Sequence, residues 1–218
     1  MNTGTNPTPL VSTLLHFAAY SGSDALVRLL IDRGANISAA TNVNPEGHVQ
    51  RAITNDSEVL NAGKGWTPLH CAAINGHDVV ARLLIENGAV VCAAAENGKT
   101  PLHCAAYEGH VAMCELLISK GANVSAVNKR GVTALFSAAM RGHEEVARML
   151  IANGAEVSIA DENGRTPLHY AAMFGWASVF RLFLLKGANV SALDVWGDTP
   201  IQMATRKMPA AVIELISE

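Results

Sequence analysis

The sequence predicts an all-α solenoid of about six stacked helix-turn-helix repeats, joined by short β-hairpin or β-turn loops. Two observations predict this fold class. Related segments recur every 33 residues along most of the chain, and a fixed period of this size is the signature of a repeat architecture. In addition, 50% of the residues are hydrophobic but only 5% are aromatic, which favours closely packed helices rich in Ala, Leu and Val over a β-sandwich.

The repeats are marked by the residues Thr-Pro-Leu-His and their variants. The copies are TLLHFAA at Thr13, TPLHCAA at Thr67 and again at Thr100, TALFSAA at Thr133, TPLHYAA at Thr166 and TPIQMAT at Thr199. Because each hairpin needs its neighbours to bury its apolar face, we expect the whole chain, residues 1–218, to form a single domain.

The marker threonine predicts the start of a first helix in each repeat. In the third copy the Thr100 hydroxyl can cap a helix, and Pro101 fits the first helical position because the N–H that proline lacks would be unpaired there. Leu102 and Ala105 begin a narrow apolar face. Gly109 then ends the helix.

A second helix is expected over residues 111–119, because Val111, Cys114 and Leu117 recur at helical spacing. Gly121 follows this segment and suits a left-handed helix cap. Each repeat therefore contains two antiparallel helices, and a loop projects where one repeat meets the next.

This pattern resembles the ankyrin-repeat family, whose unit is a β-turn followed by two antiparallel helices. The resemblance rests on the segment NGKTPLHCAAYEGHVAMCELLISKGANVSA and its siblings, and it extends from about Leu10 to Glu218. Family members bind other proteins through the hairpin tips and the concave face of the first helices. The resemblance therefore implies a non-catalytic protein-interaction module.

One insertion interrupts the period. From Thr13 to Thr67 is 54 residues, which leaves 21 extra residues at about positions 42–62. The inserted segment is polar, contains Pro45 and Gly47, and has no sustained period. It is interpreted either as a surface loop that the solenoid tolerates or as an enlarged finger that contacts a partner.

The histidines and cysteines of the markers indicate a structural role. Equivalent residues in stacked repeats lie about 10 Å apart, which is too far for His70 and His103 to share a metal ion. We expect each marker histidine to hydrogen-bond its own turn and the next hairpin. Cys71 and Cys104 adjoin these histidines, but adjacent helical residues point about 100° apart and make poor nucleophile–base pairs. No glycine-rich phosphate loop is present, so we expect no catalysis, metal or cofactor.

Charge and composition restrict the classes of molecule that the protein is expected to bind. A formal net charge of −3 gives no electrostatic reason to bind nucleic acid or an anionic membrane. No apolar run approaches the roughly 20 residues of a membrane span, and the first residues lack the features of a signal peptide. Four cysteines without a Cys-x-x-Cys pair fit reduced thiols. We expect a cytoplasmic monomer, with the nucleus as an alternative compartment.

The candidate partner-binding residues are those at which the repeats differ, because residues that maintain the fold should be uniform between copies. By the family's offsets they are Trp66, Lys99, Lys129, Arg130, Arg165 and Trp196 at the tips, and Tyr107, Met140, Arg141, Met173 and Phe174 on the first helices. Aromatic, Met and Arg side chains are enriched in protein-binding patches. Their chemistry favours a hydrophobic partner segment with some acidic residues.

Three alternatives remain open from the sequence. Trp196 either contacts a partner or packs against the adjacent hairpin, whereas Trp176, which replaces a histidine of the repeat, is expected to pack. The chain is either an independent interaction module or the recognition arm of a larger multidomain enzyme or bacterial effector. It is also compatible with a stable scaffold that has no dedicated partner.

Overall fold

The computed structural model describes residues 9–40 and 64–209, with side chains from residue 14 onward. These residues form eleven helices and no strand. The first helices of the repeats are α1 (Pro9–Tyr20), α4 (Pro68–Ile74), α6 (Pro101–Glu108), α8 (Ala134–Arg141), α10 (Pro167–Phe174) and α12 (Pro200–Lys207). The second helices are α2 (Asp24–Asp32), α5 (Asp78–Glu86), α7 (Val111–Ser119), α9 (Glu144–Ala152) and α11 (Ala177–Leu185).

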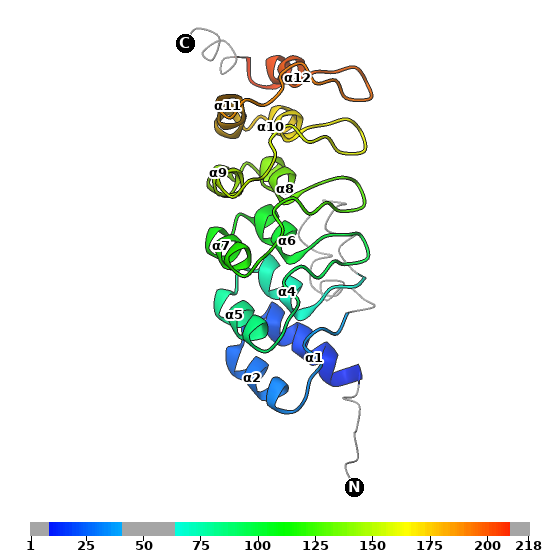
Figure 1. The fold of residues 1–218 in the computed structure, drawn as a ribbon, viewed down its shortest axis with the longest axis vertical. Coiled ribbons are helices and arrows are strands. Elements are labelled where there is room, and N and C mark those ends of the chain that lie inside the picture. The colour runs from blue at the N-terminus through cyan, green and yellow to red at the C-terminus, as the bar shows by residue number, and fades with distance from the viewer. Residues whose placement is uncertain (1–8, 41–63, 210–218) are drawn as a thin grey trace.

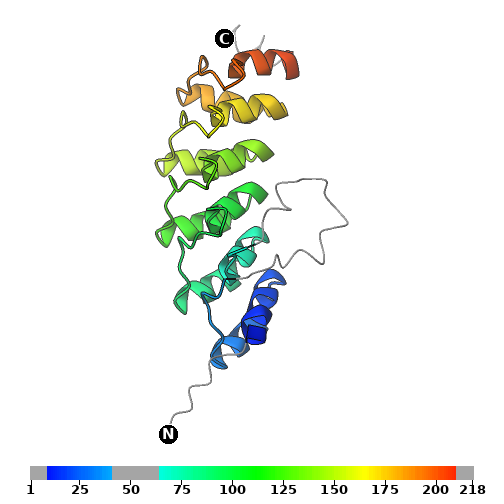
Figure 2. The same cartoon turned by 90° about the vertical axis from the view of Figure 1, so that its right-hand side faces the viewer.

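The helices stack as two parallel columns in an elongated solenoid, and the hairpin loops project to one side (Figure 1). A quarter turn shows the first helices lying one above another along the stack (Figure 2). The predicted all-α repeat solenoid is thus confirmed. The predicted insertion at about 42–62 and the last residues of the chain lie outside the described residues.

The predicted helix boundaries are confirmed in the third copy. Helix α6 begins with Pro101 directly after Thr100 and ends at Gly109, whose φ of +79° is left-handed. Helix α7 covers Val111–Ser119, and Gly121 after it also has a positive φ of +89°.

The expected helix start at Thr13 is wrong. Helix α1 begins four residues earlier, at Pro9, and Thr13 lies inside it. In the copies with a Thr-Pro marker the proline itself opens the helix, but Leu14 follows Thr13. Pro9 takes the first helical position instead, where a missing N–H costs nothing.

Each marker histidine joins two repeats. His103 Nδ1 accepts hydrogen bonds from the backbone N–H of Thr100 at 3.1 Å and from its hydroxyl at 2.9 Å. Since Nδ1 is an acceptor, the proton of the neutral ring is on Nε2, which donates to the carbonyl of Val132 in the next hairpin at 2.9 Å. His70 and His169 make the same contacts to the carbonyls of Lys99 and Asp198. The expected histidine bridges are therefore present.

A second histidine column connects each repeat to the one before it. His77, His110 and His143 make Nε2 contacts of 2.9 to 3.1 Å with the carbonyls of Tyr20, Ile74 and Tyr107. These rings lie against glycines of the preceding repeat, and a Cβ on Gly109 would lie 2.5 Å from His143 Nδ1. Glycine is therefore required there both for its left-handed φ and for the space it leaves.

Trp176 occupies this column in the fifth copy and keeps its hydrogen bond. Its indole Nε1 donates to the carbonyl of Met140 at 3.0 Å, and its ring lies against Gly142. The side chain is 40% exposed, so it is packed on one face and open on the other.

In the fourth repeat, Phe136 stands at the position that the marker histidine holds in other repeats. It is fully buried and makes an edge contact with Tyr170, with ring centroids 5.7 Å apart. No imidazole is then available to Thr133, whose buried hydroxyl has no hydrogen-bond partner within the described part of the chain. The fourth repeat thus replaces a polar bridge by aromatic packing.

The apolar faces form one continuous core along the stack. Cys71 and Cys104 lie in it with 0% and 2% exposure, so both pack as expected. Burial raises the pKa of the Cys114 thiol to about 12, and the nearby Asp78 and Glu115 act in the same direction. A thiol held protonated in this way does not act as a nucleophile.

The histidine bridges predict an acid-sensitive fold. Burial lowers the pKa of His70 and His103 from 6.5 to about 4, although the carbonyls they contact act in the opposite direction. The unfolded chain therefore takes up protons at a higher pH than the folded chain does. The stability from these groups is complete above about pH 6.5 and is lost as the pH falls toward about 4, by on the order of 3 kcal/mol per histidine.

The variant His103→Gln separates this effect from the titration of carboxylates. Gln202 already replaces the histidine in the sixth copy, where its Oε1 accepts from the Thr199 N–H at 2.8 Å. The variant should keep this cap and show a shallower loss of unfolding free energy between pH 6.5 and 4, measured by urea denaturation across that range. Parallel pH profiles for the two proteins would contradict the assignment.

Candidate functional site

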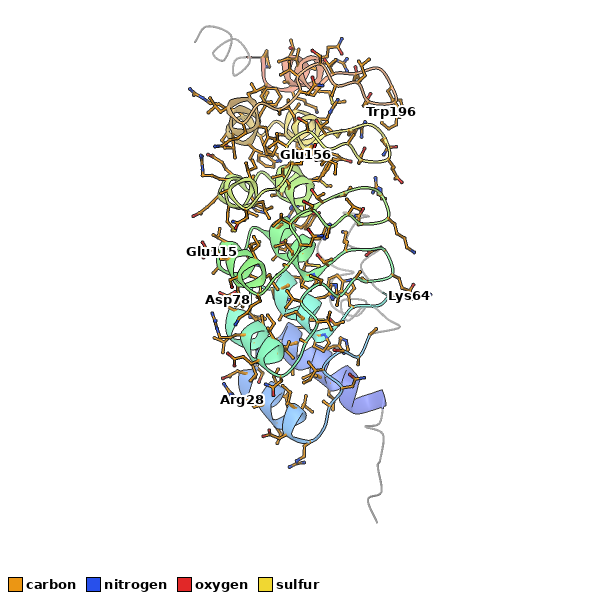
Figure 3. The ribbon with its side chains drawn as sticks, viewed as in Figure 1. Arg28, Lys64, Asp78, Glu115, Glu156 and Trp196 are labelled. Carbon is orange, nitrogen blue, oxygen red and sulfur yellow. The ribbon has the colours of Figure 1, made fainter. Side chains whose placement is uncertain are left out.

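The tips of consecutive hairpins form a row joined by backbone hydrogen bonds. In each contact a tip N–H donates to a carbonyl of the preceding tip at 2.9 to 3.0 Å: Glu96 to Lys64, Lys129 to Asn97, Glu162 to Arg130 and Val195 to Asn163. Lys64 and Trp196 mark the side of the molecule on which this row lies (Figure 3). Arg28 and Glu115, which are outer residues of the second helices, lie on the opposite side. The backbone thus fixes the spacing of the side chains that the tips carry.

Three of the tips are closed by an Asn or Asp that sequence reasoning missed. Asn128, Asp161 and Asp194 each accept hydrogen bonds through Oδ1 from two backbone N–H groups of their own tip, at 2.8 to 3.1 Å. The three residues recur at the repeat period of 33. That recurrence predicts these turn-closing residues from the sequence, because Asn and Asp tend to close turns in this way.

Asp194 also receives a side-chain donor. Its Oδ2 accepts from Arg165 Nε at 3.2 Å. Burial alone would raise the pKa of this carboxyl group, but hydrogen bonds from the Asp198 N–H, the Arg165 guanidinium and the Trp196 N–H hold the pKa below its ordinary value. The carboxylate therefore stays ionised and keeps Arg165 in place.

Three predicted partner-binding residues meet around one aromatic ring. Lys99 Nζ lies 5.7 Å and Arg141 Cζ lies 5.0 Å from the centroid of the Tyr107 ring. Lys99 comes from a tip, Tyr107 from α6 and Arg141 from the next first helix, α8. We call these three residues the cationic cluster. It presents cations beside a half-buried aromatic surface.

A second group lies at the C-terminal end of the row. The guanidinium carbon of Arg165 lies 4.3 Å from the centroid of the Trp196 ring. Trp196 is 62% exposed, so its ring, which packs against Arg165 of the adjacent hairpin, still leaves most of its surface accessible. Phe174 is 51% exposed and stacks on Tyr170 with ring centroids 6.5 Å apart.

The remaining predicted residues differ in their accessibility. Met140 and Met173 are half-buried against the core. Lys129 is exposed, and the exposed Arg130 pairs with Glu162, with 3.1 Å between Nε and Oε1. An exposed pair of this kind contributes only about 0 to 1 kcal/mol to stability, but it offsets the positive charge at that tip.

The expectation that Trp66 contacts a partner is wrong. Its side chain is 1% exposed and stacks on the ring of His70, with centroids 5.7 Å apart. Trp66 stands directly before a marker threonine, where its carbonyl contacts His16 Nε2 at 2.9 Å. The same column holds Val132, which is also buried, and Lys99, which is half-buried. Apolar side chains in this column therefore turn into the stack.

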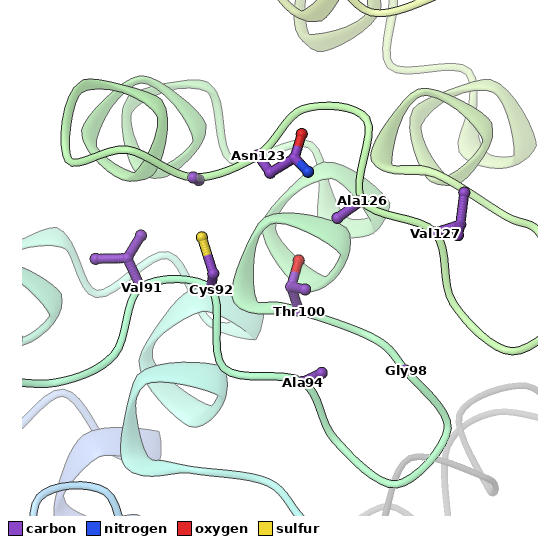
Figure 4. A pocket seen from close by; sticks show the side chains of 9 residues that line it. Val91, Cys92, Ala94, Gly98, Thr100, Asn123, Ala126 and Val127 are labelled. Carbon is purple, nitrogen blue, oxygen red and sulfur yellow. The ribbon is translucent and has the colours of Figure 1, made fainter.

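One cavity of about 300 Å³ lies between two neighbouring loops (Figure 4). Its lining consists of Val91, Cys92, Ala94, Gly98, Thr100, Ala122, Asn123, Ala126 and Val127. No lining residue is charged. Across residues 9–40 and 64–209, no group of three or more His, Cys, Asp and Glu side chains is arranged to hold a metal ion. No described helix has the length and hydrophobicity needed to cross a bilayer.

A stack of helix pairs with variable side chains on its tips defines a helical repeat protein. A family model described as ankyrin repeats in three copies matches residues 37–128, 91–161, 121–194 and 154–218. A single ankyrin-repeat model matches residues 12–42. The chain belongs to the ankyrin-repeat family, whose repeats generally act as protein–protein interaction modules and are typically non-catalytic. A comparison with curated proteins finds no match.

The two tryptophans of this surface should differ in their effect on stability. Trp66→Ala removes a buried ring and should lower the free energy of unfolding by about 3–5 kcal/mol. Trp196→Ala removes a largely exposed ring and should lower it by less than about 1 kcal/mol. Urea denaturation of both variants measures this difference, and equal losses would refute the buried position of Trp66.

Proposed function

We propose that the protein is a non-catalytic recognition module that binds a partner protein or peptide through its hairpin tips and the concave face of its first helices. The observation that carries the proposal is the placement of variable aromatic and cationic side chains on one ordered surface. Tyr107 and Trp196 each contact a cation of this surface, and both belong to columns whose residues change between copies.

The order of the tips supports this proposal energetically. Binding costs free energy when loops and side chains must become ordered. Here backbone hydrogen bonds join the tips, and the Arg165 guanidinium lies over the Trp196 ring. Asp194 in turn accepts a hydrogen bond from Arg165. Less ordering is therefore needed when a partner arrives.

The cysteines support an intracellular setting. All four are thiols in the structure, and only Cys92 is exposed. Reduced thiols are usual where glutathione and thioredoxin keep proteins reduced. We place the module in the cytoplasm or nucleus and expect it to act as a monomer.

The proposal predicts that two accessible rings, the half-buried Tyr107 and the exposed Trp196, contribute to binding and little to the fold. A partner is first identified by affinity capture and mass spectrometry, and its affinity is then measured by titration calorimetry. Tyr107→Ala and Trp196→Ala should each weaken binding about 10-fold or more, as expected for aromatic residues that a partner buries in an interface. Their helical circular dichroism should stay unchanged.

Glu115→Ala is the matched control, because Glu115 is exposed on the outer side of the stack (Figure 3). It should bind as the unchanged protein does. If both ring variants bound the partner with the affinity of the unchanged protein, the proposed binding surface would be contradicted. Deleting residues 42–62 in parallel tests whether the insertion contributes to binding.

A further inference from the structure

The first repeat exposes apolar side chains at positions that the later repeats cover. Phe17 in α1 is 59% exposed, and Leu29 in α2 is 47% exposed. The later copies hold residues of 0 to 8% exposure at the position of Phe17: Cys71, Cys104, Ser137, Tyr170 and Met203. At the position of Leu29 they hold buried or half-buried residues: Leu83, Leu116, Met149 and Leu182.

These positions face the preceding repeat. Helices α1 and α2 lie at the N-terminal end of the stack and pack on α4 and α5, which follow them (Figure 1). In the described part of the chain no helix precedes α1. Leu14 belongs to the same surface, since it is 42% exposed whereas the matching Pro68 is buried. We call Leu14, Phe17, the half-buried Leu26 and Leu29 the end face.

The opposite end of the stack is polar at its outer positions. Gln202 and Thr205 of α12 are exposed, whereas the matching His169 and Ala172 of the fifth copy are buried. A polar outer face on a terminal repeat is what keeps a solenoid soluble. The end face has the contrary character, and exposed apolar side chains gathered on one surface are typical of an interaction site.

The first repeat also lacks the group that joins the second to fifth repeats to the repeat before each of them. At that position those copies carry a ring whose nitrogen contacts a carbonyl of the preceding repeat: His77, His110, His143 and Trp176. The first copy holds Ser23, whose hydroxyl accepts from Leu26 N–H at 3.4 Å and caps α2. The end face therefore offers apolar contacts without the hydrogen bond made to another repeat. This favours a separate helix as its occupant.

The stack shows which side chains complement such a face. The first five copies carry a Leu and, four positions later, an Ala in the first helix. In α4 these are Leu69 and Ala73, which are both 0% exposed. In α12, after which no helix follows in the described residues, the matching Ile201 is half-buried and Thr205 is exposed. The Leu and Ala positions therefore face the following repeat and pack against its covered positions.

We infer that the end face binds an amphipathic α-helix of a partner protein, whose apolar side carries a Leu or Ile and a small residue four positions apart. This contact continues the helix packing that repeats along the stack. Arg28 of α2 and Trp196 of the last tip lie at opposite ends of the molecule (Figure 3), so the end face is a second site and does not rest on the proposed function. Its contacts are apolar, and binding should therefore change little with salt.

A phage-displayed library of helical peptides of about 18 residues tests the inference, because that length spans about five helical turns. The peptides share a frame of Glu, Lys and Gln, which favour helix, and the positions of one face are randomised. Peptides selected on the unchanged protein should carry Leu or Ile and a small residue four positions apart. For the best synthetic peptide, fluorescence anisotropy should show that Phe17→Gln weakens binding at least about 10-fold, because the variant removes apolar surface that the helix buries.

Phe174→Gln is the matched control, since Phe174 is also an exposed phenylalanine of a first helix, at 51% exposure. It should bind the peptide as the unchanged protein does. Leu29→Gln alters the end face from α2 and should weaken binding as Phe17→Gln does. Both end-face variants replace exposed side chains, so urea denaturation should show nearly unchanged free energies of unfolding.

Four results would overturn the inference. The first is equal peptide binding by the unchanged protein, Phe17→Gln and Leu29→Gln. The second is a dimer in sedimentation equilibrium that Phe17→Gln dissociates, which would assign the end face to a second copy of the chain. The third is a rise in peptide affinity of about 10-fold or more on deletion of residues 2–8 or 42–62, which would assign it to the chain's own segments.

The fourth is a failure to select any helical peptide on the unchanged protein. None of these results bears on the tips, because the effect of Trp196→Ala on the captured partner is measured separately. The end face and the proposed recognition surface can therefore fail independently of each other.

Discussion

The neutral marker histidine is the contact on which the rest of the structure depends. One imidazole accepts from the threonine that begins its own helix and donates to the carbonyl at the base of the next tip, as His103 does with Thr100 and Val132. The second histidine column reaches back, as His143 does to Tyr107. The second and third repeats are thus connected forward and backward by buried or half-buried hydrogen bonds, which would be costly to leave unmade. In the fourth repeat the packing of Phe136 on Tyr170 replaces the forward bond.

This arrangement separates the residues that hold the stack from those that face outward. The histidines and the closing Asn or Asp residues hydrogen-bond mainly to backbone groups, and the glycines leave space for neighbouring rings. These contacts therefore depend little on the identity of neighbouring side chains. Positions such as Lys99 and Trp196 can therefore change without disturbing the row of tips. Variation between repeats then alters the surface and not the fold, which is the property that a protein-recognition scaffold needs.

The repeat period and the helix boundaries follow from the sequence because they depend on local chemistry repeated at a fixed interval. The start of α1 at Pro9 does not, because Leu14 follows the marker threonine of the first copy and Pro9 offers an earlier helix start. The direction of Trp66 could not be predicted from its offset either, since only the stack shows that this column turns apolar side chains inward. The pairing of Arg130 with Glu162 joins residues 32 positions apart, and it becomes visible only once neighbouring tips are side by side.

Native-state hydrogen exchange at the tips tests the central claim most directly. If histidine bridges and backbone bonds hold the tips as one ordered row, the exposed-loop amides of Lys129 and Glu162 should exchange at least about 1,000-fold more slowly than in an unstructured peptide. Both donate to the preceding tip, at 2.9 and 3.0 Å. Exchange of these two amides within about 10-fold of the unstructured rate, while the core helices stay protected, would contradict the account.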